Sequence, residues 1–102
     1  MLLVAHPVKE FLNDLNPSLR AKVDRHLDLL KNNPTRLRMP FSKKIRTDLF
    51  ELRILGNTNV RIFYSYYLDN TILLHAFIKK THKLPGKELK LALRRLKALT
   101  LK

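Results

Sequence analysis

The chain has 102 residues, 45% of them hydrophobic, which predicts one globular domain spanning residues 1–102 with room for one modest core. It contains no cysteine, which excludes disulfides, thiolate nucleophiles and cysteine-based zinc sites and suits the reducing cytoplasm in which we expect the protein. No apolar run approaches the roughly 20 residues that span a bilayer, so we expect no membrane partner.

Positive charge rises along the chain. Lysine and arginine together number 21, against 8 aspartates and glutamates, and the formal net charge is +13. The net charge is +1 over residues 1–33, +4 over residues 34–70 and +8 over residues 71–102. An even excess would serve solubility alone, whereas this gradient predicts a basic face that binds a polyanion such as a nucleic acid.

Two helices are expected in the first third of the chain. In HPVKEFLNDL, residues 6–15, apolar side chains recur every three or four positions, as on one face of a helix. A second helix is expected to begin with Asn16 as N-cap and Pro17 in its first turn. It ends before Pro34, since a residue that precedes proline is pushed out of the α region. The short break between the helices predicts an αα-hairpin, and residues 34–48 are interpreted as an irregular connector.

The apolar period changes from 3.6 to 2 after residue 48, which is typical of β-strands. Strands are predicted over residues 49–55, 60–68 and 71–80. Turn residues separate them at 56–59 and at Asp69-Asn70, so consecutive strands should pair antiparallel. The alternation places Arg53 and Arg61 opposite the apolar side chains, which predicts a second sheet face at least partly open to solvent.

A basic helix is expected over residues 87–99, after Pro85-Gly86, with leucines on one face and cations over the remainder. The predicted fold class is α+β. It comprises two N-terminal helices, a three-stranded or at most four-stranded antiparallel sheet, and the C-terminal basic helix.

Acidic residues are too sparse near the basic region for metal-dependent chemistry. Residues 71–102 contain one acid, Glu88, and the four histidines show no H-x₃-H spacing. Two glycines do not make a phosphate-cradling loop. We therefore expect no metal and no cofactor.

Cations can act on RNA without a metal, because RNA carries its own nucleophile, the 2′-hydroxyl. Preorganised guanidinium and ammonium groups would stabilise the charge that develops on the phosphate. Arg53 and Arg61 on neighbouring strands, with Lys79 and Lys80 at the end of the next strand, are the candidates. His82 is the acid or base candidate, because imidazole titrates near neutral pH.

These residues also have simpler interpretations. Arg53 and Arg61 could be solvated strand residues that pair with Glu51 or Asp48. Lys79 and Lys80 could protect a sheet edge against aggregation. His82 could be an ordinary surface histidine.

Further residues are candidates for RNA binding. Lys43, Lys44 and Arg46 are interpreted as contacts to the RNA backbone or as a solvated loop. Tyr67 lies on the predicted side of Arg61 and could stack on a base. Lys83 extends the basic run after the third strand. His75, inside an apolar strand, is expected to be a hydrogen-bonded core residue.

The stretches LFELRI (49–54), VRIFYSYY (60–67) and FIKKTHKLP (77–85) together resemble the RelE/HigB superfamily of bacterial toxins, in its phage-derived HigB-like branch. The resemblance covers roughly residues 8–96. The combination of E-L-R-I with F-I-K-K-T-x-K-x-P carries the specificity. Only residues 1–5 precede His6-Pro7, so the strand with which members open should be shortened or missing.

The resemblance implies a type II toxin that cleaves mRNA on the ribosome through 2′-hydroxyl attack. It implies a cognate antitoxin as partner, often a helix-turn-helix protein, besides mRNA and the ribosome. It also places Arg53, Arg61 and the segment 79–83 where the family keeps its phosphate-binding and catalytic groups. A gyrase inhibitor on the same fold and a non-catalytic nucleic-acid-binding module remain the alternatives.

Overall fold

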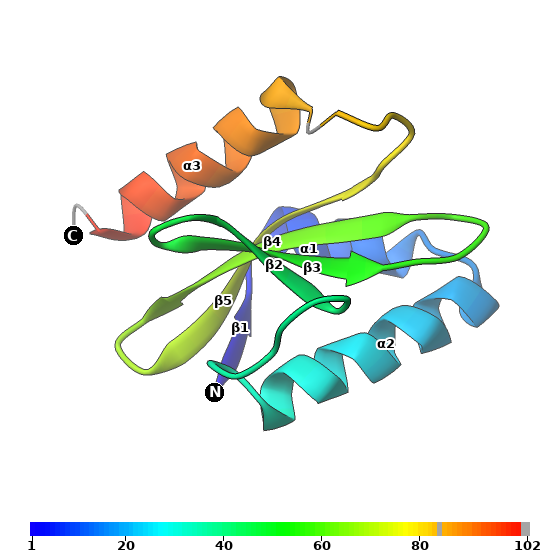
Figure 1. Ribbon diagram of the computed structural model, residues 1–102, viewed down its shortest axis with the longest axis horizontal. Coiled ribbons are helices and arrows are strands. Elements are labelled where there is room, and N and C mark those ends of the chain that lie inside the picture. The colour runs from blue at the N-terminus through cyan, green and yellow to red at the C-terminus, as the bar shows by residue number, and fades with distance from the viewer. Residues whose placement is uncertain (84, 101–102) are drawn as a thin grey trace.

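A five-stranded sheet forms the centre of the protein (Figure 1). The structure, a computed structural model, describes residues 1–83 and 85–100 of the chain. The predicted domain also includes residue 84 and residues 101–102, which lie outside the described residues. The elements in chain order are β1 (Leu2–Val4), α1 (His6–Asn13), α2 (Pro17–Asn32), β2 (Ser42–Arg46), β3 (Leu49–Ile54), β4 (Val60–Tyr67), β5 (Asn70–Ile78) and α3 (Gly86–Thr100). The strand order across the sheet is β1-β5-β4-β3-β2.

The predicted sheet, with three or at most four antiparallel strands, is wrong. The sheet is mixed, because β1 pairs parallel to β5 with Leu2 opposite Thr71, while the other neighbours pair antiparallel. A three-residue strand such as β1 is too short to show an apolar period. It is held by main-chain bonds, such as the one that the Ala5 N–H donates to the Leu73 carbonyl at 3.0 Å.

Residues 34–48, which were predicted to be a connector without regular structure, contain a strand, β2. This edge strand pairs only with β3, and its side chains from Lys43 to Arg46 are exposed or half-buried. An edge strand with solvated side chains needs no apolar alternation, so its sequence does not reveal it.

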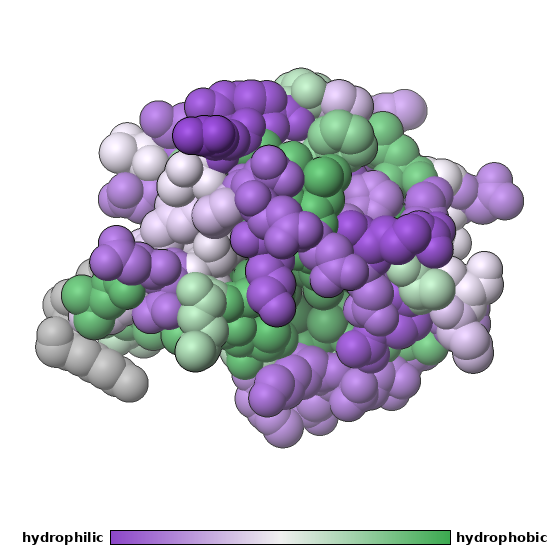
Figure 2. Space-filling view, turned by 90° about the horizontal axis from the view of Figure 1, so that it is seen from below, coloured by the Kyte–Doolittle hydropathy of each residue, from purple (hydrophilic) through white to green (hydrophobic). Residues whose placement is uncertain are grey.

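Helices α1 and α2, which the apolar period predicted, pack on the same face of the sheet. The Asn16 side chain accepts a hydrogen bond from the Leu19 N–H at 2.9 Å and caps α2. The main core forms between these helices and the sheet. Its fully buried members include Val8, Val23, Leu30, Leu52, Ile62 and Leu73. Seen from the α2 side, polar residues surround an apolar strip (Figure 2).

Helix α3 lies across the other face of the sheet, above it in Figure 1, with α2 below. A second core cluster forms there and includes Leu49, Phe63, Leu74, Phe77 and Ala92. The face predicted to be open is therefore covered along much of β4 and β5. What remains of it for a site is the end near Arg53 and Arg61.

The turn between β4 and β5 lies one residue earlier than predicted. Its two central residues are Leu68 and Asp69, with φ values of 49° and 64°, between the paired Tyr67 and Asn70. Positive φ at both positions is the backbone of a two-residue hairpin turn. Leucine is unusual at a turn position with positive φ, whereas aspartate and asparagine are common there, so the sequence favoured a turn at Asp69-Asn70.

No helix within the described residues is long and apolar enough to cross a membrane.

Candidate functional site

A basic pocket lies at one end of the sheet, where β3 and β4 meet the segment that follows β5. Its volume is about 300 Å³. The residues that line it are Arg53, Asn59, Arg61, Lys79, Lys80, Thr81 and His82. All five residues predicted as catalytic line this one pocket.

Strand register brings the two arginines together. Arg53 and Arg61 are direct partners across the β3–β4 pair, so their side chains lie on the same sheet face. The Lys79 N–H donates to the Asn59 carbonyl at 2.8 Å, which fixes the chain after β5 beside the start of β4. The lysines and His82 therefore follow the strand end directly, at the side of the arginines.

Glu51 lies beneath the two arginines, and its side chain is 4% exposed. Its Oε1 is 3.8 Å from Nε of Arg53 and 3.7 Å from Nε of Arg61. Both separations are ion pairs that are too long to be good hydrogen bonds. Glu51 Oε2 and the two Nε atoms are buried without a hydrogen-bond partner in the described part of the chain.

Arg61 is buried, which departs from the prediction that it should not point into a core. Its side chain is 4% exposed, and that of Arg53 is 22% exposed. Burial lowers the pKa of the Arg61 guanidinium, the Glu51 carboxylate opposes this shift, and the Arg53 charge adds to it. The burial is tolerated because a carboxylate lies between the two cations.

The lysines and His82 form the outer part of the basic pocket. Lys79 is half-buried, whereas Lys80, Thr81 and His82 are exposed. The pocket thus has one buried and one half-buried arginine at its base, and half-buried or exposed donors at its rim. The guanidinium and ammonium groups can hold a phosphate by charge-assisted hydrogen bonds, with the imidazole of His82 beside it.

The predicted RNA-binding residues are dispersed. Lys43 pairs with Glu51 and so lies on the face of the basic pocket, whereas Lys44 pairs with Phe50 and lies on the opposite face. Arg46 is exposed beyond a register shift at the end of β2. Tyr67 ends β4 and packs half-buried against the second core, roughly 20 Å along the strand from Arg61. Lys83 is exposed and follows the pocket-lining residues without lining the pocket.

His75 is a hydrogen-bonded core residue, as expected, and it joins β5 to α3. Its Nε2 is 2.7 Å from Oε1 of Glu88, and its Nδ1 is 3.0 Å from NH1 of Arg95. Arg95 is always a donor, so Nδ1 accepts and the Nε2–H donates to Glu88. His75 pairs with Phe63, and the register shift that follows in the β4–β5 pair passes over Leu74. His75 therefore lies on the sheet face that carries Phe63 and faces α3.

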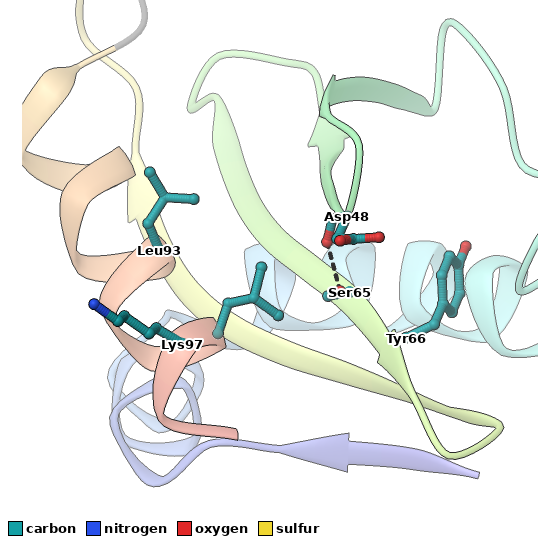
Figure 3. A pocket seen from close by; sticks show the side chains of 6 residues that line it. Asp48, Ser65, Tyr66, Leu93 and Lys97 are labelled. Atoms are coloured by element: carbon teal, nitrogen blue, oxygen red, sulfur yellow. Dashed lines mark hydrogen bonds between the residues drawn. The ribbon is translucent and has the colours of Figure 1, made fainter. Parts of the chain in front are cut away.

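A second pocket, of about 380 Å³, lies between α3 and β4 (Figure 3). Leu93 and Lys97 approach it from α3, and Ser65 and Asp48 from the sheet side. The Ser65 hydroxyl donates to the Asp48 backbone carbonyl at 2.5 Å. The lining is mixed and lacks a concentration of cations, so it does not suit a phosphate as the basic pocket does.

Metal ligands do not come together in the part of the chain that the structure describes. No three histidine, aspartate or glutamate side chains there are grouped so that they could hold a metal ion. Glu51 is a single carboxylate next to two cations. The donor set of the basic pocket therefore suits an anion and not a metal.

Asn59 and Thr81 line the pocket although the sequence did not indicate them, whereas Glu51 was expected only as a possible ion-pair partner of the two arginines, and it is one. The alternation in LFELRI places Glu51 on the side of Arg53, and this was the available signal. It gains meaning only with the register that sets Arg61 opposite Arg53.

A family model described as Phage derived protein Gp49-like (DUF891) matches residues 10–97, a range that includes the whole basic pocket. A search of curated proteins found no match to this chain.

Proposed function

The chain belongs to the Gp49-like family of phage-derived proteins, and from this premise we propose that it is the toxin of a type II toxin–antitoxin system that cleaves mRNA. One observation carries the proposal: two arginines, two lysines and a histidine line one small pocket on a strongly basic chain. The resemblance to RelE/HigB toxins supports the same activity.

The proposed reaction uses the RNA as its own nucleophile. The ribose 2′-oxygen bonds to the neighbouring phosphorus as the P–O5′ bond breaks. The 2′-hydroxyl proton leaves to a base, and the departing 5′-oxygen takes up a proton. The products are a 2′,3′-cyclic phosphate and a 5′-hydroxyl end, so no water or metal enters the bond-breaking step.

The arginines, the lysines and the histidine of the pocket each have a role in this scheme. Arg53 and Arg61 hold the non-bridging phosphate oxygens from the base of the pocket, where burial strengthens their electrostatic effect. Lys79 and Lys80 stabilise the charge that develops on the phosphate and the leaving oxygen. His82, exposed at the rim, exchanges a proton with the 2′-oxygen or the 5′-oxygen.

Partners follow from the same charges. The phosphate backbones of mRNA and ribosomal RNA would be the polyanion that this basic chain binds. Lys43 and Lys83 are exposed and could contact an RNA strand where it continues beyond the basic pocket. An antitoxin, of the helix-turn-helix type by resemblance, would keep the toxin inactive until it is needed.

Cleavage of a defined mRNA on translating ribosomes tests this proposal, with Lys80→Ala compared with Lys31→Ala. Both lysines are exposed and both variants lose one positive charge, but Lys31 lies on α2, on the opposite side of the sheet. We expect Lys80→Ala to cut about 10²-fold more slowly and Lys31→Ala to cut like the wild type.

Mapping the new RNA ends completes the test. Cyclic phosphate and 5′-hydroxyl ends are expected. Intact mRNA with strong, salt-sensitive binding would instead show a non-catalytic nucleic-acid-binding module. Intact mRNA with double-strand breaks in DNA after induction would show a gyrase inhibitor.

A further inference from the structure

Glu51 is the most unusual buried group outside the proposed chemistry. It is 3% exposed, it lies within ion-pair distance of the two arginines at the base of the basic pocket, and its cross-strand partner on β2 is Lys43. A buried carboxylate normally accepts several hydrogen bonds. Here Oε2 accepts none within the described residues, and Oε1 has only ion pairs at 3.7 and 3.8 Å.

The two arginines need a reason to lie side by side. Arg53 and Arg61 are direct cross-strand partners, and like charges in that relation repel. A carboxylate between them offsets the repulsion and attracts both Nε atoms. In each arginine Nε is the nitrogen that faces Glu51. NH1 of Arg53 lies 3.3 Å from Sδ of Met39, and NH1 of Arg61 donates to the Val60 carbonyl at 3.3 Å, so an incoming phosphate would replace these two long contacts.

Glu51 is not itself placed to react. It does not line the basic pocket, and Oε2 is shielded from solvent. A general base must come within about 3 Å of the proton that it removes. Its only route to the substrate is through the arginines.

We propose that Glu51 is a positioning residue that aims the guanidinium groups of Arg53 and Arg61 at the scissile phosphate. The role rests on the proposed RNA cleavage. Binding of a phosphate would draw the two guanidinium groups together over the carboxylate.

Glu51→Gln tests this role, because it keeps the side-chain shape and removes the charge. Glu10→Gln is the matched control: it makes the same change at an exposed glutamate of α1. We expect Glu51→Gln to lower kcat by about tenfold or more, with KM unchanged or lower because the pocket becomes more positive. Glu51→Asp keeps the charge and should recover part of the lost kcat.

An arginine signal independent of cleavage separates this inference from the proposed function. In wild-type protein the Nε–H groups of Arg53 and Arg61 should give NMR resonances that exchange slowly with water. Glu51→Gln should speed their exchange and reduce the shift that inorganic phosphate causes. These changes should appear even if wild-type protein does not cut RNA, in which case the proposed function fails and what stands is that Glu51 orients the two arginines toward a bound phosphate.

Three results would overturn the role. One is an unchanged kcat together with unchanged Nε–H exchange. Another is a higher KM at unchanged kcat, which would make Glu51 a determinant of binding. The third is a lower melting temperature with full activity per folded molecule, which would make it a structural residue. If Glu51→Gln does not fold, Glu51→Asp decides, since its carboxylate is withdrawn by one methylene and an intact kcat and exchange rate would contradict the role.

Discussion

Removing the Glu88 carboxylate should loosen α3 from the sheet. Glu88 accepts the Nε2–H of His75 at 2.7 Å, and the His75 and Glu88 side chains are 11% and 23% exposed. Glu88→Ala would leave the imidazole N–H poorly solvated and without its partner. Glu88→Gln would keep an acceptor oxygen at the same position.

The expected cost follows from this geometry. A hydrogen bond to a charged group contributes about 1.5–3 kcal/mol, and the partial exposure of Glu88 favours the lower end of that range. We therefore expect Glu88→Ala to lower the free energy of unfolding by about 1.5–2 kcal/mol and Glu88→Gln by about 0.5 kcal/mol. For a domain near 100 residues, the alanine variant should melt about 6–16 °C lower.

Urea denaturation followed by circular dichroism measures both variants. A cycle with His75→Phe, which keeps the ring stacked on Phe77, isolates the coupling between the two side chains. We expect a coupling energy of about 1 kcal/mol. Additive effects, or a cost for Glu88→Ala equal to that of Glu10→Ala on the surface of α1, would refute the proposed link between α3 and β5.

Three further predictions concern metal, pH and backbone. A phosphorothioate at the cleavage site should slow the reaction, and thiophilic Cd²⁺ should not restore it; rescue by Cd²⁺ would show a metal at the phosphate. Burial raises the pKa of Tyr64 and Tyr66, so both phenols stay neutral in the folded state while those of the unfolded chain ionise. Stability in urea should therefore be level from pH 8 to about pH 10 and fall above it, and a level profile up to pH 11.5 would contradict this. Leu68→Gly should raise the free energy of unfolding by about 1 kcal/mol, because φ is 49° there and the side chain is 77% exposed; a loss of stability would show that Leu68 makes contacts of value.

The helices and the central strands could be predicted because their signals are local. Asn16 and Pro34 bound α2, and alternation runs through β3 and β4. β1 and β2 could not be predicted in this way. One is a three-residue strand defined by its parallel partner, and the other is an edge strand with solvated side chains.

The residues proposed to act in the candidate site could be predicted from the sequence, but the burial of its arginines could not. Arg53 and Arg61 followed from alternation, and Lys79 to His82 from the charge run after β5. The burial of Arg61 was not predictable, because it depends on the register that pairs Arg61 with Arg53, on Glu51 lying near both and on the segment after β5 lying beside them. Tyr67 lies on the same sheet face as Arg61, as predicted, but at the opposite end of β4, away from the pocket. Alternation predicts the face of a side chain and not its distance from another residue along the strand.

A single 2′-deoxynucleotide placed at the mapped cleavage position of an mRNA tests the central claim most directly. The claim is that the cations of the basic pocket support attack by the 2′-hydroxyl of the RNA. We predict that cleavage disappears at the modified position and continues at unmodified positions of the same transcript. Equal cleavage at the deoxynucleotide would contradict the account, because another nucleophile would then be breaking the bond.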